Sequence, residues 1–324
     1  MHTLDFVMVI AGAALLWVGA EWIVDSASAI ARRFNVSELV IGLTIVAMGT
    51  SAPEFLVTAN AAFKGLEDIS LANVVGSNFF NLGMILGLMA IIRPIPTHKV
   101  VLFRDGLLLF GVTMLVTLMA MNGRLGRIEG VFLVLLLAGY VGVLLYVGLR
   151  SSRETRVQVG LPEQEVAMHA GERVARWWDY PKLAAGFAGI ALGSELLVEG
   201  ASSIAMALGV SSWVIGLTIV AAGTSLPELV TCMAASIKGK NDMLLGNLIG
   251  SDFFNFAGVL GVTCILRPMG VQPSSMMSMY VLVGAVAMVL VFIRSGWRIG
   301  RFEGSTLLIL ALVRWGMEFA KGTG

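Results

Sequence analysis

Long apolar stretches alternate with short polar ones along almost the whole chain. Ten stretches approach the roughly 20 residues that an α-helix needs to cross a bilayer, and they are centred near residues 15, 48, 80, 110, 139, 192, 222, 255, 284 and 310. The first five residues, MHTLD, lack the basic start of a secretory signal, so we expect the mature chain to begin here and to retain its first stretch as a span. This pattern predicts an all-α polytopic membrane protein with ten transmembrane helices.

One polar segment divides the ten stretches into two sets of five. It lies between residues 150 and 180 and mixes several arginines with several glutamates. We therefore predict a first five-helix unit at residues 1–150, a solvated linker at residues 151–178, and a second five-helix unit at residues 179–324.

The two units are related by a sequence repeat. Residues 42–54 read GLTIVAMGTSAPE and residues 216–228 read GLTIVAAGTSLPE, at a shift of 174 positions. The same shift relates Glu21 to Glu195, Asn73 to Asn247, Ser77 to Ser251, Asn81 to Asn255, Arg93 to Arg267, and Glu129 to Glu303. A duplicated and fused gene explains these matches. Because five is an odd number of spans, the second unit must enter the membrane in the opposite sense, so we predict two inverted five-helix repeats.

Composition supports the membrane location and excludes other classes of function. Hydrophobic residues make up 57% of the chain and charged residues 13%, and the mean hydropathy is +0.87, far from the balance of a soluble domain. The net charge of +1, without a long basic run, argues against a nucleic-acid partner. Cys232 and Cys264 both lie in apolar runs, so no disulfide framework or cysteine metal motif is expected. We expect no cofactor and no obligate protein partner.

Basic residues are distributed unevenly between the two sides of the predicted bundle. One set of alternate loops carries most of them, including Arg32, Arg33, Arg93, Arg150, Arg173, Lys238, Lys240 and Arg301. The opposite set carries only Lys64, Arg124, Arg127, Arg267 and Lys321. Because Lys and Arg gather in cytoplasmic loops, we predict a cell-membrane protein with a cytoplasmic linker and both termini outside.

Two carboxylates lie deep within apolar stretches. An ionised carboxylate at the bilayer centre costs roughly 2.5 to 3.5 kcal/mol, so Glu54 and Glu228 are candidates for function. On a helix, each glutamate shares one face with the residues three, four and seven positions before it. These faces consist of Ala47, Thr50, Ser51 and Glu54 in one repeat, and of Ala221, Thr224, Ser225 and Glu228 in the other. Pro53 and Pro227 should bend both helices and free nearby carbonyls, which are tolerated at this depth only where they line a polar cavity or bind a ligand.

The next span of each repeat carries a polar residue at every fourth position. These stripes consist of Asn73, Ser77 and Asn81, and of Asn247, Ser251 and Asn255. Alone, such a stripe is equally explained by hydrogen bonds between helices, but beside two glutamates it favours a cation site. All the ligands are oxygens, which suits Ca²⁺ or Na⁺ and argues against zinc or copper. Two bidentate glutamates with the carbonyls of Thr50 and Thr224 would supply six oxygens. The two negative charges of the glutamates balance one Ca²⁺, two Na⁺ or two protons.

These motifs resemble the two alpha-repeats of the sodium/calcium exchanger family, within the calcium/cation antiporter superfamily. The resemblance covers GTSAPE with Gly76-Ser77-Asn78 in residues 42–81, and GTSLPE with Gly250-Ser251-Asp252 in residues 216–255. Ten spans with a short linker are similar to the prokaryotic members. The resemblance implies a secondary antiporter that works by alternating access, in which Na⁺ entering down its gradient drives Ca²⁺ out.

The resemblance also implies which residues bind the ions. Glu54 and Glu228 would be the central ligands shared by Ca²⁺ and Na⁺. The other oxygens would come from Ala47, Thr50, Ser51, Ser77, Asn81, Ala221, Thr224, Ser225, Ser251 and Asn255. Some members have Asp at the position of Asn255, whereas this chain has Asp252 where the repeat pattern, as at Asn78, has Asn. The resemblance therefore leaves Asp252 turned toward a neighbouring helix or the aqueous entrance.

Other functions use the same features. An exchanger of H⁺ for Ca²⁺, or one assisted by K⁺, remains an alternative on the same fold, because two glutamates can equally carry protons. An intramembrane hydrolase could use paired carboxylates, but the mirrored polar sets and the lack of a substrate-recognition domain predict a protein that is not an enzyme. A channel stays open as an alternative, although inverted repeats with interrupted helices mark secondary transporters; flux that saturates and requires a counter-ion would exclude it.

Overall fold

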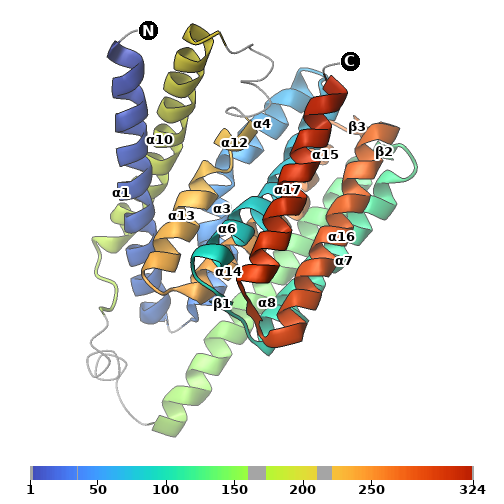
Figure 1. The fold of residues 1–324 in the computed structure, drawn as a ribbon. Helices are drawn as coiled ribbons and strands as arrows, with labels where there is room; N and C mark the ends of the chain where they lie inside the picture. Colours follow the sequence, from blue (N-terminus) through green and yellow to red (C-terminus); the bar gives the residue numbers. More distant parts are fainter. Residues whose placement is uncertain (1–2, 35, 160–172, 210–220, 323–324) are drawn as a thin grey trace.

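The computed structural model describes residues 3–34, 36–159, 173–209 and 221–322, most of which are helical (Figure 1). The first half consists of α1 (Thr3–Phe34), α2 (Glu38–Ile41), the π-helix η1 (Gly42–Val46), α3 (Ala47–Thr50), α4 (Ala52–Phe63), α5 (Glu67–Phe79), the π-helix η2 (Phe80–Ile85), α6 (Leu86–Ile92), β1 (Ile95–Pro96), the π-helix η3 (Val101–Gly106), α7 (Leu107–Ala120), β2 (Arg124–Leu125) and α8 (Arg127–Val159). The second half consists of α10 (Asp179–Ala207), α12 (Ala221–Gly223), α13 (Leu226–Ile237), α14 (Asn241–Phe254), the π-helix η5 (Asn255–Leu260), α15 (Gly261–Leu266), β3 (Met269–Gly270), α16 (Pro273–Gly296), β4 (Arg298–Ile299) and α17 (Arg301–Gly322).

Seven helices in the described part of the chain are long and apolar enough to cross a bilayer. They are Thr3–Phe34, Ile69–Ile92, Val101–Ala120, Arg127–Val147, Asp179–Ala207, Asn241–Leu266 and Ser275–Gly296. The bent pair Glu38–Thr50 and Ala52–Phe63 adds an eighth if it is counted as one span. The predicted span near residue 222 lies partly outside the described residues, and α17 is not among the seven. The helical, multi-span architecture is confirmed, while the number ten stays a prediction.

The bend predicted at Pro53 is present. α3 ends at Thr50, α4 begins at Ala52, and the two helices meet at 46°. Proline lacks an N–H, so it fits the first turn of a helix but not its interior, and Pro53 accordingly lies in the first turn of α4. The second half is interrupted at the matching place, since α12 ends at Gly223 and α13 begins at Leu226.

Contacts between the two halves recur with the halves exchanged. The strand β1 pairs antiparallel with β4, and β2 pairs antiparallel with β3. A shift of 174 positions carries β1 onto β3 and β2 onto β4. Exchanging the two halves therefore turns the β1–β4 pair into the β2–β3 pair, as expected of two related units that pack around a common axis.

The contact between α1 and α10 also joins equivalent elements of the two halves, and its close packing depends on glycine residues. The two helices run side by side in Figure 1, in blue and yellow-green. A Cβ on Gly12 would lie 2.7 Å from the Gly193 carbonyl oxygen, and one on Gly19 would lie 2.8 Å from that of Gly186. Small residues allow such close backbone approach between membrane helices, where van der Waals packing drives association.

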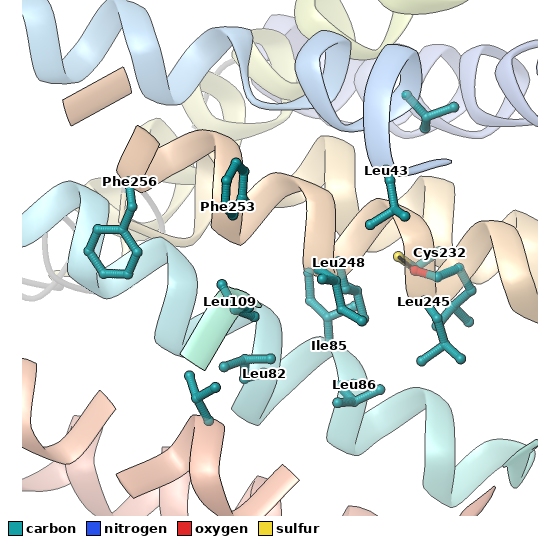
Figure 2. Packing of buried hydrophobic residues seen from close by; sticks show 14 of the residues in the cluster. Leu43, Leu82, Ile85, Leu86, Leu109, Cys232, Leu245, Leu248, Phe253 and Phe256 are labelled. Carbon is teal, nitrogen blue, oxygen red and sulfur yellow. Dashed lines mark hydrogen bonds between the residues drawn. The ribbon is translucent and has the colours of Figure 1, made fainter. Parts of the chain in front are cut away.

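The centre of the bundle is the segment α14–η5–α15, whose apolar window is 83% buried. Figure 2 shows Leu245, Leu248 and Phe253 of α14 packed near Leu82 and Ile85 of η2. Apolar neighbours on several sides therefore surround this segment. A polar side chain on α14 or η5 that faces inward therefore needs partners from the protein or from a bound ligand.

Replacing Gly19 with alanine should lower the free energy of unfolding by about 1 to 3 kcal/mol, because the added methyl group would overlap the backbone of α10. Thermal or denaturant unfolding in detergent measures this change. Gly139→Ala on α8 is the matched control, since a Cβ there meets nothing within 4 Å, and its better helix propensity should leave stability equal or higher. Equal loss of stability in both variants would contradict the tight α1–α10 contact.

Candidate cation site

Each helix break places a glutamate in the interior of the protein. Ser51 and Ser225 are the residues immediately before α4 and α13, and Glu54 and Glu228 lie in the first turns of those helices. The two carboxylate side chains are only 1% and 0% exposed. The first turn of a helix carries a partial positive charge and unpaired N–H groups, which favours an acidic side chain there. Each helix break therefore lowers the free-energy cost of burying a carboxylate in the interior of the protein.

The two breaks face each other across the halves. The Ser51 hydroxyl donates a hydrogen bond of 2.8 Å to Glu228 Oε1, and the Ser225 hydroxyl donates one of 3.2 Å to Glu54 Oε1. Ser251 of α14 lies 3.4 Å from the same oxygen of Glu228. The Oε2 atoms of both glutamates are buried and have no hydrogen-bond partner in the protein. One oxygen of each carboxylate is therefore fixed, and the other is available to a ligand.

A second pair of contacts joins α5–η2 to α14–η5. Asn81 Nδ2 donates to Asp252 Oδ1 at 2.9 Å, and Asn255 Nδ2 donates to Asn78 Oδ1 at 2.9 Å. These two bonds are again related by exchange of the halves. The remaining side-chain oxygens of Asn81, Asp252 and Asn255 are buried without a partner. The predicted ligands Asn81 and Asn255 thus lie in one network with two residues that the predicted ligand set omitted.

Two π-helices set the position of this network. Asn81 lies at the start of η2, and Asn255 is the first residue of η5. A π-helical turn inserts one extra residue into an α-helix and commonly occurs at functional sites. The spacing of every fourth residue predicted one continuous polar face, but its members contact different partners. Asn73 donates to the Glu54 carbonyl at 3.3 Å and to Thr58 Oγ1 at 3.0 Å, so it holds α4 in place.

The two halves of the site differ in detail. Thr50 Oγ1 donates to Asn247 Oδ1 at 3.2 Å and lies 3.4 Å from Ser251 Oγ. Its counterpart Thr224 has a buried Oγ1 without a hydrogen-bond partner. Ser77 is 5% exposed, but among the described hydrogen bonds it makes none like that of Ser251. The hydrogen bonds that Thr50 makes to α14 therefore have no counterpart at Thr224.

The last predicted ligands are backbone groups. The Ala47 carbonyl accepts the Ser51 N–H at 3.1 Å and the Thr50 hydroxyl at 3.3 Å. Ala221 lies at the start of α12. No feature of the sequence indicated the partners that join the halves, such as Ser51 with Glu228, because those contacts arise only when the two units pack.

The donor set is chemically specific. It combines two carboxylates with hydroxyl, amide and carbonyl oxygens, and the described residues contain no group of three or more His, Cys, Asp or Glu side chains placed to hold a metal. Oxygen ligands of this kind suit hard cations and not zinc or copper. Fold and donor set together define a multi-pass membrane protein with a buried candidate site whose oxygens suit hard cations.

Comparisons with known proteins agree with this class. The family described as "Sodium/calcium exchanger protein" matches residues 4–146 and 182–314. The sodium/calcium exchanger MaX1 of Methanosarcina acetivorans is 33% identical over 338 residues, covering 95% of this chain and 97% of the relative. The inner membrane protein YrbG of Escherichia coli K12 is 32% identical over 320 residues, covering 95% and 96%. Among solved structures, the sodium-calcium exchanger NCX_Mj soaked with Na⁺ superposes with a TM-score of 0.82 at 33% identity, covering 97% of this chain and 98% of its own.

The chain belongs to the sodium/calcium exchanger family. It is a membrane transporter of the cation/Ca²⁺ exchange class, with Na⁺ and Ca²⁺ as the substrates of its family. The predicted resemblance is thereby confirmed, and a hydrolase is not supported.

Ser51→Ala should destabilise the cation-free protein by about 1.5 to 3 kcal/mol, because Glu228 loses a hydrogen bond to a buried charge. Saturating Ca²⁺ should remove most of this difference, since the ion would then hold the carboxylate. Thermal unfolding with and without Ca²⁺ measures both values. Ser70→Ala is the control, because Ser70 donates to the neutral Thr58 carbonyl and its cost should not depend on Ca²⁺. A Ca²⁺-independent loss in Ser51→Ala would contradict the prediction.

Proposed function

We propose that this protein exchanges Na⁺ for Ca²⁺ by alternating access and normally extrudes Ca²⁺. Its architecture would be ten transmembrane helices arranged as two inverted five-helix repeats, at residues 1–150 and 179–324, with a cytoplasmic linker at residues 151–178. The observation that carries the proposal is the reciprocal pairing of Glu54 with Ser225 and of Glu228 with Ser51. This pairing holds two buried carboxylates at helix breaks, each with one oxygen free for a cation.

Ca²⁺ would bind between the two glutamates. Ca²⁺ takes about six to eight oxygen ligands, and the free oxygens Glu54 Oε2, Glu228 Oε2 and Thr224 Oγ1 are buried near the breaks. Carbonyl and hydroxyl oxygens at both breaks would complete its shell. Two negative charges neutralise one Ca²⁺ or two Na⁺, so the two ions would compete for the same carboxylates.

Alternating access is favoured by the exchanged contacts. Two units that make the same contacts with their roles swapped can exchange conformations, so a bundle closed at one end has a counterpart closed at the other. The difference between Thr50, which bonds to α14, and Thr224, which has no such partner, fits one of these two states. The opposite state would place Thr224 against the α5 side of the site.

Glu54→Gln and Glu228→Gln should each abolish Na⁺-driven Ca²⁺ flux and leave the protein folded, because each removes one of the two charges that replace the hydration shell of the ion. Radioactive Ca²⁺ uptake into proteoliposomes, driven by a Na⁺ gradient or by a pH gradient, measures the activity and its coupling ion. Glu195→Gln, at an exposed position of α10, is the control and should transport normally. Near-normal flux in either site variant would refute the assignment, and flux driven only by pH would favour the H⁺/Ca²⁺ alternative.

The proposed orientation rests on where the basic residues lie. Lys238 pairs with Asp25 at 2.5 Å, Lys240 with Glu38 at 2.7 Å, and Arg32 with Glu38 at 3.4 Å. These pairs join the end of α1 to the start of α2 and to the connection between α13 and α14, so residues predicted to be cytoplasmic gather at one end. The beginning of α1 and the end of α17 both lie at the opposite end of the bundle, at the top of Figure 1.

Cysteine labelling in intact cells tests this orientation. In a background without Cys232 and Cys264, a cysteine at Asn122, between α7 and β2, should react with a membrane-impermeant maleimide from outside. A cysteine at Gln164, within the linker, should react only after the cells are opened, because the basic residues hold that side in the cytoplasm. The reverse pattern would overturn the orientation.

A further inference from the structure

The two helices that begin with the buried glutamates end in equivalent lysines. The helix α4 carries Glu54 in its first turn and is followed directly by Lys64, and α13 carries Glu228 in its first turn and is followed directly by Lys238. The shift of 174 positions relates the two lysines, and they have nearly the same backbone conformation. Each lysine therefore lies at the far end of a helix that holds one carboxylate of the candidate site.

Only one of these lysines has an acidic partner in the described conformation. Lys238 Nζ donates to Asp25 Oδ1 at 2.5 Å, and this ion pair joins α13 to α1. The same shift carries Asp25 onto Glu199 of α10, so Glu199 with Lys64 is the equivalent pair. Both of these side chains are exposed, and no ion pair joins them in the described part of the chain. The sequence thus provides two equivalent pairs, of which the structure forms one.

Helix packing shows the same difference between the halves. The helix α1 packs along α13, whose lower end lies beside it in Figure 1, whereas the equivalent helices α10 and α4 make little contact. The contact between α1 and α10 has no such difference, because exchanging the halves turns Gly12 with Gly193 into Gly186 with Gly19. The α1–α10 unit is therefore joined symmetrically within itself, but it meets the two glutamate helices unequally.

We propose that Asp25–Lys238 and Glu199–Lys64 are alternative ion-pair latches that close opposite ends of the protein in turn. Inverted repeats can exchange conformations, and the exchange that separates α1 from α13 would bring α10 against α4. A partly exposed ion pair contributes little to folding, but a small difference in free energy is enough to shift the populations of two states of similar stability. This inference rests on the alternating access in the proposed function.

The end that is closed in the described conformation has further ion pairs. Asp25 also lies 3.7 Å from Lys182 of α10, while Glu38 of α2 pairs with Lys240 at 2.7 Å and with Arg32 at 3.4 Å. The residues at the equivalent positions of the other half are uncharged. They are Met8 for Lys182, Ser212 for Glu38, Leu66 for Lys240 and Met206 for Arg32. These additional pairs should make the described conformation the more populated one.

Crosslinking of the second pair tests whether the opposite conformation forms. In a background without Cys232 and Cys264, the variant Lys64→Cys with Glu199→Cys is treated with a short, cleavable bifunctional thiol reagent, without an ion gradient. The two cysteines should become crosslinked, because α10 would approach α4 in the opposite conformation. The control variant Asp25→Cys with Lys64→Cys combines residues of two different latches and should not become crosslinked. Absence of the first crosslink with Na⁺, with Ca²⁺ and without either ion would overturn the proposal.

Opening the latch that is closed in the structure tests whether the two pairs alternate. Adding Lys238→Met to the crosslinking variant should raise the rate of the Lys64→Cys with Glu199→Cys crosslink several-fold, because it removes the ion pair between α13 and α1. Lys182→Met is the matched control. It removes the other lysine beside Asp25, but this lysine joins α10 to α1, which stay together, so the rate should not change.

A second variant guards against a local folding defect at Lys238. Asp25→Asn opens the same latch from the side of α1 and should raise the crosslinking rate as Lys238→Met does. Unchanged rates in both Lys238→Met and Asp25→Asn, or equal increases in these variants and in Lys182→Met, would refute the latches.

These measurements are independent of which ions the protein exchanges, because no gradient is imposed. Absence of Na⁺-driven Ca²⁺ flux in the wild type would refute the proposed function and leave the crosslinking rates readable. Normal flux together with rates that do not respond to Lys238→Met and Asp25→Asn would refute the latches alone. If both hold, crosslinking Lys64→Cys to Glu199→Cys should stop the flux, and cleavage of the reagent should restore it.

Discussion

Two carboxylates that water does not reach impose the main constraint on this protein. Glu54 and Glu228 are almost fully buried, and an ionised carboxylate at membrane depth costs roughly 2.5 to 3.5 kcal/mol even on a lenient scale. The helix breaks reduce this cost by placing each glutamate in a first helical turn, and a serine from the other repeat fixes one of its oxygens. In the proposed function, a cation balances the remaining charge of the two carboxylates.

The repeat at a shift of 174 positions accounts for a candidate site assembled from two halves. Each half supplies a carboxylate and the serine that holds the carboxylate of the other half, so neither half contains a complete site. The same exchange appears in the strand pairs and in the glycine contacts between α1 and α10. A bundle whose contacts occur in swapped pairs has two equivalent ways to pack, which is the physical basis of the proposed alternation.

Departures from the repeat are as informative as the repeat itself. Asp252 stands where the first half has Asn78, and Thr50 is bonded where Thr224 has no partner. The first difference lies in the sequence itself, so no change of conformation can remove it. The second concerns packing, and a change of conformation can reverse it.

The sequence by itself determined the class of fold and most of the candidate site. Hydropathy and the 174-residue shift predicted a multi-span helical protein, and the positions of Glu54 and Pro53 predicted a bent helix carrying a buried acid, because span length, proline geometry and the cost of burial are local properties. Which side chains bond to one another across the two repeats was decided only by the tertiary structure. The contacts of Ser51 with Glu228 and of Asn81 with Asp252 join residues more than 170 positions apart. A helical stripe shows which residues share a face, but only the packing of the two repeats decides what that face meets.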